Sequence, residues 1–179
     1  MPKCEAIRGY SLLELLLTLA IVAAVLTVGV PSFSGILANA RLRTETDSLF
    51  HAIHLARKES IVQRRVVTLC PTRDELTCSG ESDWSGAWMM FVNEDRDWPA
   101  VRDPDEPVLR VHVVDPAVRI TANRRSFSLR TANLRATNGT LVFCDRSTRA
   151  KSRALVVSYT GRPRVAYADR RGRSYACAD

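Results

Sequence analysis

The chain has 179 residues, of which 46% are hydrophobic and 25% charged, a composition typical of a folded protein. This length allows one globular domain plus an anchoring segment and excludes two separate cores. The net charge of +7 is uneven: from residue 119 onward fourteen Lys and Arg face three acids, a balance of +11, so residues 1–118 carry −4. The positive C-terminal third favours polyanionic partners.

Residues 12–30 form an apolar run that only Glu14, Thr18, Thr27 and Gly29 interrupt. About twenty helical residues at 1.5 Å each match a hydrocarbon core of about 30 Å, so we predict a single-pass transmembrane helix over residues 10–31. The basic residues before the run favour a cytoplasmic N-terminus and an exported remainder. A cleavable secretory signal peptide is the alternative, but no convincing small-x-small cleavage site follows the run.

Glu14 lies inside this run, where an unpaired carboxylate costs roughly 2.5 to 3.5 kcal/mol or more. If residues 1–9 are a leader that is cut after Gly9, Tyr10 gains a free amine that is mostly protonated at neutral pH. That cation can pair with Glu14 of the same helix or of a neighbour. The alternative is a tolerated glutamate near the helix end whose side chain reaches the headgroups.

The helical pattern resumes after Pro31, which we expect to kink or locally break the helix because it has no amide hydrogen to donate. Beyond it, apolar residues recur at steps of seven, four and three, at Leu42, Leu49, Ile53 and Ala56. We therefore predict that residues 32–64 continue the helix and pack an apolar face on a head. His51 and His54 share a helix face without a partner, and we interpret them as surface or packing residues.

Residues 65–179 contain short β-type runs separated by turn-forming residues, a pattern typical of antiparallel sheet. The runs occupy residues 66–70, 87–92, 108–114, 118–122, 126–129, 141–144, 154–159 and 163–167. We predict an α+β fold in which the long helix packs on this β-rich head. Residues 74–106 hold ten acids against two arginines; calcium binding is conceivable, but the usual glycine-turned loop is absent and we favour a solvated loop.

Four of the five cysteines follow the apolar run and would reach an oxidising compartment if that run spans a membrane. Cys70, Cys78, Cys144 and Cys177 allow three pairings. We favour Cys70–Cys78 with Cys144–Cys177, because each bond would tie a strand end or a tail. A zinc site is the alternative, but no C-x-x-C pair occurs and the three histidines lie away from these spacings.

The stretch RGYSLLEL at residues 8–15, with the apolar run and Pro31 after it, resembles the class III signal of type IV pilins and pseudopilins. Only Tyr10 departs from that signal, where phenylalanine is usual. The resemblance implies that a prepilin peptidase cuts after Gly9 and methylates the new amine of Tyr10. It also implies that Glu14 helps to dock the subunit among other pilins in a filament.

The head resembles the GspH/FimT family of minor pilins and pseudopilins, and most of all its FimT members. The stretches that carry this resemblance are Ala56-Arg57, VTLCP at 67–71, GAW at 86–88, FVN at 91–93, VLR at 108–110, GRPR at 161–164 and Cys177. The resemblance implies two β-sheets packed on the long helix.

Arginines of the C-terminal third form the candidate binding site. Gly161 permits an unusual backbone angle and Pro163 fixes its own, so Arg162 and Arg164 should be presented on a rigid turn. Guanidinium groups suit phosphates, and a chain of them suits the backbone of double-stranded DNA without reading its bases. The predicted DNA-binding residues are Gly161, Arg162, Arg164, Arg170, Arg171, Arg173, Arg146, Arg149, Lys151 and Arg153.

Tyr167 and Tyr175 are close enough in the sequence to add base stacking. The alternative to a DNA site is a solvated basic face, or one that meets acidic neighbours in a filament. The sequence has no nucleophile elbow, phosphate-binding glycine loop, metal triad or dinucleotide fingerprint, so we predict no enzyme activity, no cofactor and no metal site.

Through the G-R-x-R turn, the resemblance implies a FimT-like minor pilin that binds extracellular DNA during natural transformation. Such a subunit would first lie in the inner membrane with its head in the periplasm and then in the pilus at the cell surface. Two alternatives stay open: a structural minor pilin for pilus biogenesis or adhesion, and a GspH-like pseudopilin of type II secretion.

Overall fold

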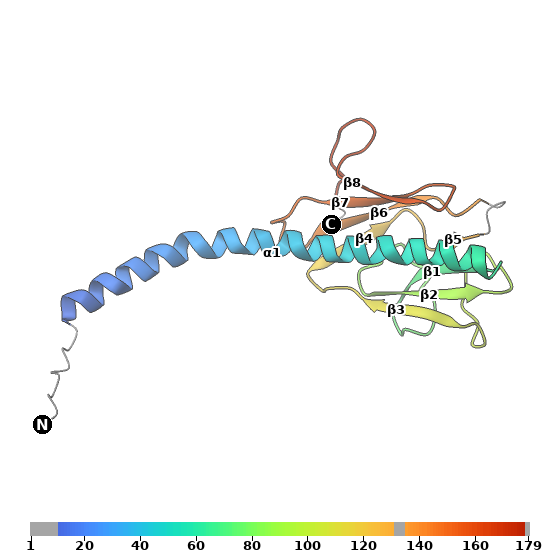
Figure 1. Cartoon of the computed structure of the whole chain (residues 1–179), viewed down its shortest axis with the longest axis horizontal. Helices are drawn as coiled ribbons and strands as arrows, with labels where there is room; N and C mark the ends of the chain where they lie inside the picture. Colours follow the sequence, from blue (N-terminus) through green and yellow to red (C-terminus); the bar gives the residue numbers. More distant parts are fainter. Residues whose placement is uncertain (1–10, 131–134, 178–179) are drawn as a thin grey trace, which may run out of the picture.

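The computed structural model describes residues 11–130 and 135–177, so the predicted cleavage site at Gly9 and Tyr10 lies outside the described residues. One long helix, α1 (Leu12–Val62), begins at Ser11, whose hydroxyl accepts a hydrogen bond from the Glu14 amide at 3.3 Å. The predicted local break at Pro31 is absent. The helix is continuous through this residue and only curves along its N-terminal half (Figure 1), because bending accommodates the missing amide hydrogen.

The first half of α1 extends away from the head as a stalk (Figure 1). Its large exposed side chains from Leu12 to Leu37 are between 42% and 79% accessible. Across residues 11–130 and 135–177, no helix contains a stretch long and apolar enough to cross a membrane. The transmembrane helix over residues 10–31 stays a prediction.

The second half of α1 packs on the head, as predicted. Its buried apolar residues recur on one face at Ala38, Leu42, Leu49, Ala52, Ile53 and Ala56. On the same side, the carboxylate of Glu45, only 5% exposed, lies 2.8 Å from Nε2 of His112 and accepts the amide of Asp115 at 3.1 Å. These bonds satisfy a carboxylate that would otherwise be costly to bury.

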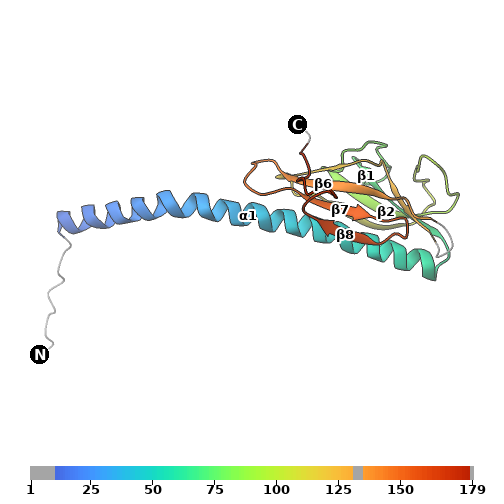
Figure 2. The ribbon, with the colours of Figure 1, turned by 90° about the horizontal axis from the view of Figure 1, so that it is seen from above.

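The head consists of two four-stranded antiparallel sheets, which confirms the predicted α+β fold. Sheet A has the order β3-β2-β1-β5 and sheet B the order β4-β6-β7-β8. The strands are β1 (Val66–Thr72), β2 (Ala87–Asn93), β3 (Val108–Val113), β4 (Val118–Ala122), β5 (Phe127–Leu129), β6 (Gly139–Asp145), β7 (Arg153–Val157) and β8 (Pro163–Ala166). Figure 2 shows the second half of α1 along one side of the head, where it contacts strands of both sheets.

The two ends of sheet B lie near different parts of α1. We call the end near the C-terminus of α1 the distal end and the end near the stalk the proximal end. At the distal end, a Cβ at Gly161 would lie 3.5 Å from Nη1 of Arg57, near the C-terminus of α1. At the proximal end, a Cβ at Gly35 would lie 4.0 Å from the carbonyl of Arg149, near the stalk. Because the sheet is antiparallel, β4 and β7 end at the distal end, and β6 and β8 begin there.

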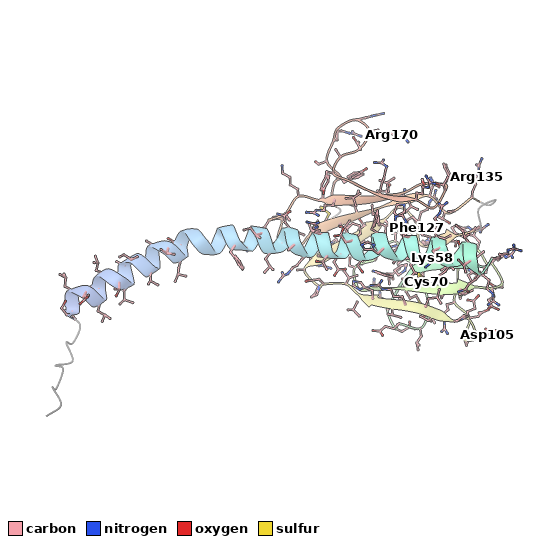
Figure 3. The ribbon with its side chains drawn as sticks, in the orientation of Figure 1. Lys58, Cys70, Asp105, Phe127, Arg135 and Arg170 are labelled. Atoms are coloured by element: carbon pink, nitrogen blue, oxygen red, sulfur yellow. A yellow bond between two sulfur atoms is a disulfide. The ribbon has the colours of Figure 1, made fainter. Side chains whose placement is uncertain are left out.

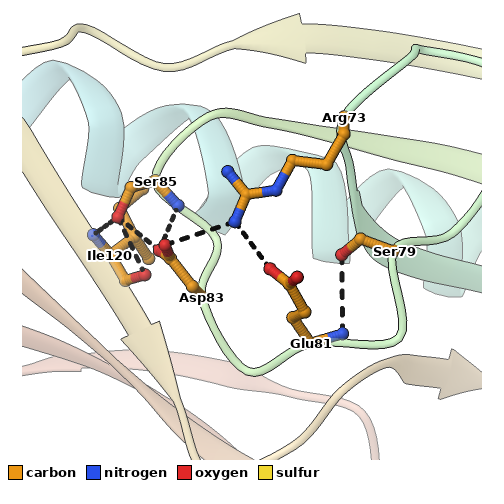
Figure 4. Close-up of polar contacts among 6 residues, drawn as sticks. All are labelled: Arg73, Ser79, Glu81, Asp83, Ser85 and Ile120. Carbon is orange, nitrogen blue, oxygen red and sulfur yellow. Dashed lines mark hydrogen bonds and ion pairs between the residues drawn. The ribbon is translucent and has the colours of Figure 1, made fainter.

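The acidic loop between β1 and β2 is fastened by internal polar contacts (Figure 4). Arg73 pairs with Glu81 at 2.6 Å and with Asp83 at 3.4 Å. Burial raises the pKa of Asp83, but hydrogen bonds from Ser85 and the Arg73 charge outweigh it, so its pKa lies below the ordinary value. Within the described residues, no group of three or more His, Cys, Asp or Glu is placed to hold a metal ion.

Both favoured disulfides are present. Cys70 bonds to Cys78 across eight positions, and Cys144 bonds to Cys177 across 33. Phe143 faces the core and Cys144 points to the opposite face of β6, so the second bond fastens the C-terminal tail on the outer face of sheet B.

Candidate nucleic-acid interface

The predicted arginine turn joins β7 to β8 at the distal end of sheet B. The amide of Gly161 donates to the Ser158 carbonyl at 2.9 Å, and the amide of Ser158 donates to the Arg162 carbonyl at 3.1 Å. The Ser158 hydroxyl accepts the Arg162 amide at 3.2 Å. Gly161 has φ of 70°, the left-handed region that favours glycine, and its site is buried. The residue types therefore define the shape of this turn.

We expect Gly161→Ala to lower the free energy of unfolding by about 2 to 3 kcal/mol, because the new methyl group is strained at positive φ and would lie 2.8 Å from Leu129 Cδ1. Gly172→Ala is the matched control, because Gly172 has φ of 76° but no atom within 4 Å of its Cβ position. That variant should cost about 1 to 2 kcal/mol. Guanidinium denaturation of the full chain in detergent measures both; equal costs would contradict the role of the Leu129 contact.

Arg162 and Arg164 flank a buried Pro163 and are both exposed. Arg164 lies opposite Val156 on the outer face of sheet B, and Arg162 precedes it by two residues on the same side of the chain. Neither arginine side chain forms a hydrogen bond or an ion pair with any residue in the described ranges. Two uncompensated guanidinium groups are thus held on one rigid turn.

The other seven predicted basic residues lie at the proximal end, around the connection from β6 to β7 and the tail after β8. Arg173 pairs with Asp169 at 3.0 Å, and backbone hydrogen bonds from Arg173 and Arg171 help to hold the pKa of Asp169 below its ordinary value. Arg153 lies over the ring of Tyr167, with its guanidinium carbon 5.6 Å from the ring centroid. These two arginines are therefore already engaged within the chain.

In the same region, burial raises the pKa of Asp145. Hydrogen bonds from the Ser147 hydroxyl and from the Arg149 amide outweigh burial, so this pKa lies below its ordinary value. The ionised carboxylate thus shapes the loop that carries Arg146, Arg149 and Lys151.

The ten predicted residues do not form one surface. Gly161, Arg162 and Arg164 lie toward the distal end, whereas Arg146, Arg149, Lys151, Arg153, Arg170, Arg171 and Arg173 lie at the proximal end. Arg164 lies opposite Val156, three positions along β7 from Arg153, so the nearest members of the two groups are about 10 Å apart along the strand. In Figure 3, Arg170 projects from the tail, away from Arg135, which lies at the far end of the head.

Residues that were not predicted to belong to the binding site lie beside the turn. The guanidinium of Arg135 lies 5.7 Å from the ring centroid of Tyr159, and the Ala136 amide donates to the Tyr159 carbonyl at 2.9 Å. Nη1 of Arg57 is buried near Gly161 without a hydrogen-bond partner among the described residues. The predicted stacking residues, Tyr167 and Tyr175, lie instead with the proximal group. Tyr159 and Arg135 are far apart in the sequence and come together because β6 pairs with β7. The sequence alone therefore did not indicate this contact.

Comparison with known proteins identifies solved structures with a similar fold. A search of curated proteins gave no match. Two crystal structures of the type IV minor pilin FimU from Pseudomonas aeruginosa are similar. One is 20% identical over 69% of this chain and 91% of that chain, with a TM-score of 0.50. The other is 19% identical over 72% of this chain and 90% of that chain, with a TM-score of 0.52. At these identities, the likeness establishes the fold alone.

A family model described as type II transport protein GspH matches residues 45–161. Neither comparison distinguishes the predicted FimT members from the rest of the family. The family and the fold are those of pilin-like structural proteins, which assemble with other pilins and are associated with a pilus or the cell surface. Because the matched residues make up more than half of the chain, the chain belongs to the GspH family.

Proposed function

We propose that this chain is a minor type IV pilin of the FimT kind whose arginine turn binds extracellular DNA during natural transformation. The observation that carries the proposal is the pair Arg162 and Arg164, which are exposed and unpaired on a rigid turn. This turn lies at the distal end of the head, away from the stalk. A site there stays accessible when the stalk packs among other subunits.

The stalk supports the filament part of the proposal. Its exposed apolar side chains would be favourable to bury against helices of neighbouring subunits, at about 25 cal/mol per Å². Glu14 lies in the first turn of α1, and in the sequence it comes four positions after Tyr10, whose amine a cut after Gly9 would expose. The cut after Gly9, the methylation and the role of Glu14 in assembly stay predictions, and so does an inner-membrane stage.

The DNA part of the proposal rests on charge and predicts binding that is independent of sequence. Phosphate contacts release counterions, so affinity should fall steeply with salt, with a log-log slope of about 0.9 for each phosphate engaged. Arg162 and Arg164 would contact phosphates, and such contacts position a protein on DNA without carrying sequence information.

We expect the double variant Arg162→Ala with Arg164→Ala to bind duplex DNA about tenfold to a hundredfold more weakly at about 0.1 M salt, with a log-log slope lower by about 1.8. The measurement is a salt titration of the full chain in non-ionic detergent with a fluorescent duplex. The matched control is Arg170→Ala with Arg171→Ala, which removes the same charge from the proximal end. If the control loses binding and the turn variant keeps it, the site lies at the proximal end and the proposal is wrong.

A second candidate function is a pseudopilin of type II secretion, which the description of the matching family model favours. In that case, deletion of the gene should block protein secretion, and the turn variant should leave DNA uptake unchanged. Loss of DNA uptake with normal secretion supports the pilus function.

A third candidate function is a structural minor pilin without DNA binding. It predicts that deletion of the gene abolishes filaments and that the turn variant leaves DNA uptake unchanged.

A further inference from the structure

A pocket on the head is lined by an exposed tryptophan and two arginines. Its volume is about 380 Å³, within the range of small-molecule sites. The residues that line it include Trp98 and Pro99 as well as Arg124 and Arg125. Trp98 is 64% exposed, whereas the other tryptophans, Trp84 and Trp88, are fully buried. An indole ring is thus available to a ligand beside two arginines.

The charged side chains that line this pocket are all positive. No acidic side chain lines it, and Arg125 has no hydrogen bond or ion pair with a residue of the described ranges. Arg124 is held in place, because its Nε donates to the Asn138 carbonyl at 3.0 Å and its own carbonyl accepts Nε1 of Trp84 at 3.2 Å. The pocket therefore combines a flat apolar ring with a positive wall.

The pocket and the arginine turn both lie at the distal end of sheet B. Arg124 follows the end of β4, and Arg162 precedes the start of β8. These are the two outer strands of the sheet, so about three interstrand spacings, or roughly 14 Å, separate them. Arg135 and Tyr159 lie between them, next to the ends of β6 and β7. Basic side chains therefore lie next to β4, next to β8 and between these two strands at the distal end.

We propose that this distal track, formed by Arg162, Arg135, Arg124 and Arg125, guides a strand of DNA into the pocket, where an unpaired base stacks on Trp98. The inference rests on the proposed function and deepens it. Arginine forks suit the phosphates along the track, and an exposed indole ring suits the face of any base. Bases inside a duplex are stacked and cannot enter such a pocket. The ligand is therefore single-stranded DNA or a frayed duplex end.

The proposal predicts a difference between single strands and duplexes. Trp98→Ala should weaken the binding of a single-stranded oligonucleotide of about twelve nucleotides by about 5- to 100-fold, the usual effect of losing one base stack. Duplex of the same sequence, with its ends closed by non-nucleotide linkers so that no unpaired base is present, should bind the variant within about twofold of the unmodified chain. Trp98→Phe is the matched control and should keep most of the single-strand affinity, because it retains a ring. Fluorescence anisotropy with the full chain in detergent measures each affinity.

A second variant tests the positive wall. Arg125→Ala should weaken single-strand binding and lower its log-log salt slope by about 0.9. Unchanged single-strand affinity in both Trp98→Ala and Arg125→Ala overturns the pocket, and so does an equal loss for single strand and closed duplex. Neither result affects the arginine turn, whose test is the loss of duplex binding in the Arg162 and Arg164 variant. A chain that binds neither form of DNA overturns both proposals.

Discussion

Replacement of Cys144 and Cys177 by alanine should lower the free energy of unfolding by about 3 to 4 kcal/mol. The bond closes a loop across 33 positions, and a cross-link of that length removes much conformational entropy from the unfolded chain. In the folded chain it fixes the tail, in which the Tyr175 carbonyl accepts the Ser152 hydroxyl at 2.7 Å. Guanidinium denaturation of the full chain in detergent, under oxidising conditions, measures the loss.

The second disulfide provides the matched control. Cys70 and Cys78 are eight positions apart, so the same loop-closure relation gives about 2.5 kcal/mol for the variant with alanine at both. A reversed order of the two losses would show that local packing, and not loop length, determines the contribution of each bond. The apolar cluster of Met89 and Phe91 around Cys70 is where such packing would act.

Most of the fold could be predicted because its signals are local. The steps between Leu42, Leu49 and Ile53 identify the packed face of α1, and all three are fully buried. Strand positions follow from β-branched and aromatic runs between turn formers, and the observed strands differ from the predicted runs by two residues or fewer at each end. The cysteine pairing was predicted from the same local pattern of strands, since each bond ties a strand to a neighbouring loop or tail.

The candidate site could be predicted only in part, because strand direction decides which arginines meet. Arg153 and Arg162 are close in the sequence, but Arg153 begins β7 and Arg162 follows its end, so the strand places them at opposite ends of sheet B. Conversely, Arg124 and Arg162 are far apart in the sequence and share one end, because their strands run in opposite directions. Sheet order is a tertiary property, and no short stretch of sequence encodes it.

The burial of Trp84 in the core is another feature that the local sequence did not predict. It lies in the loop between β1 and β2, outside any predicted strand, yet its side chain is fully buried. Its amide donates to the Ile120 carbonyl at 2.8 Å, which ties the loop to β4, and its ring meets Phe127 edge to face at 5.6 Å between centroids. The loop chemistry in Figure 4, where Ser85 bonds Asp83 and Ile120, holds the neighbouring backbone.

We expect Trp84→Ala to lower the free energy of unfolding by about 3 to 5 kcal/mol, because it leaves a large cavity between the two sheets. Trp98→Ala removes the same side chain from an exposed site and should cost less than about 1 kcal/mol. Both are measured by guanidinium denaturation of the full chain in detergent. Similar costs for the two variants would contradict the assignment of Trp84 to the core.

Trp84→Phe separates packing from hydrogen bonding at this site. It keeps a ring against Phe127 but leaves the Arg124 carbonyl without the indole donor, so we expect an intermediate loss of about 1 to 3 kcal/mol. Because that carbonyl bond positions the backbone of Arg124, the same variant should also weaken single-strand binding while closed duplex binding stays within about twofold of the unmodified chain. If the stability falls and single-strand binding does not, Trp84 stabilises the core without positioning Arg124 at the pocket.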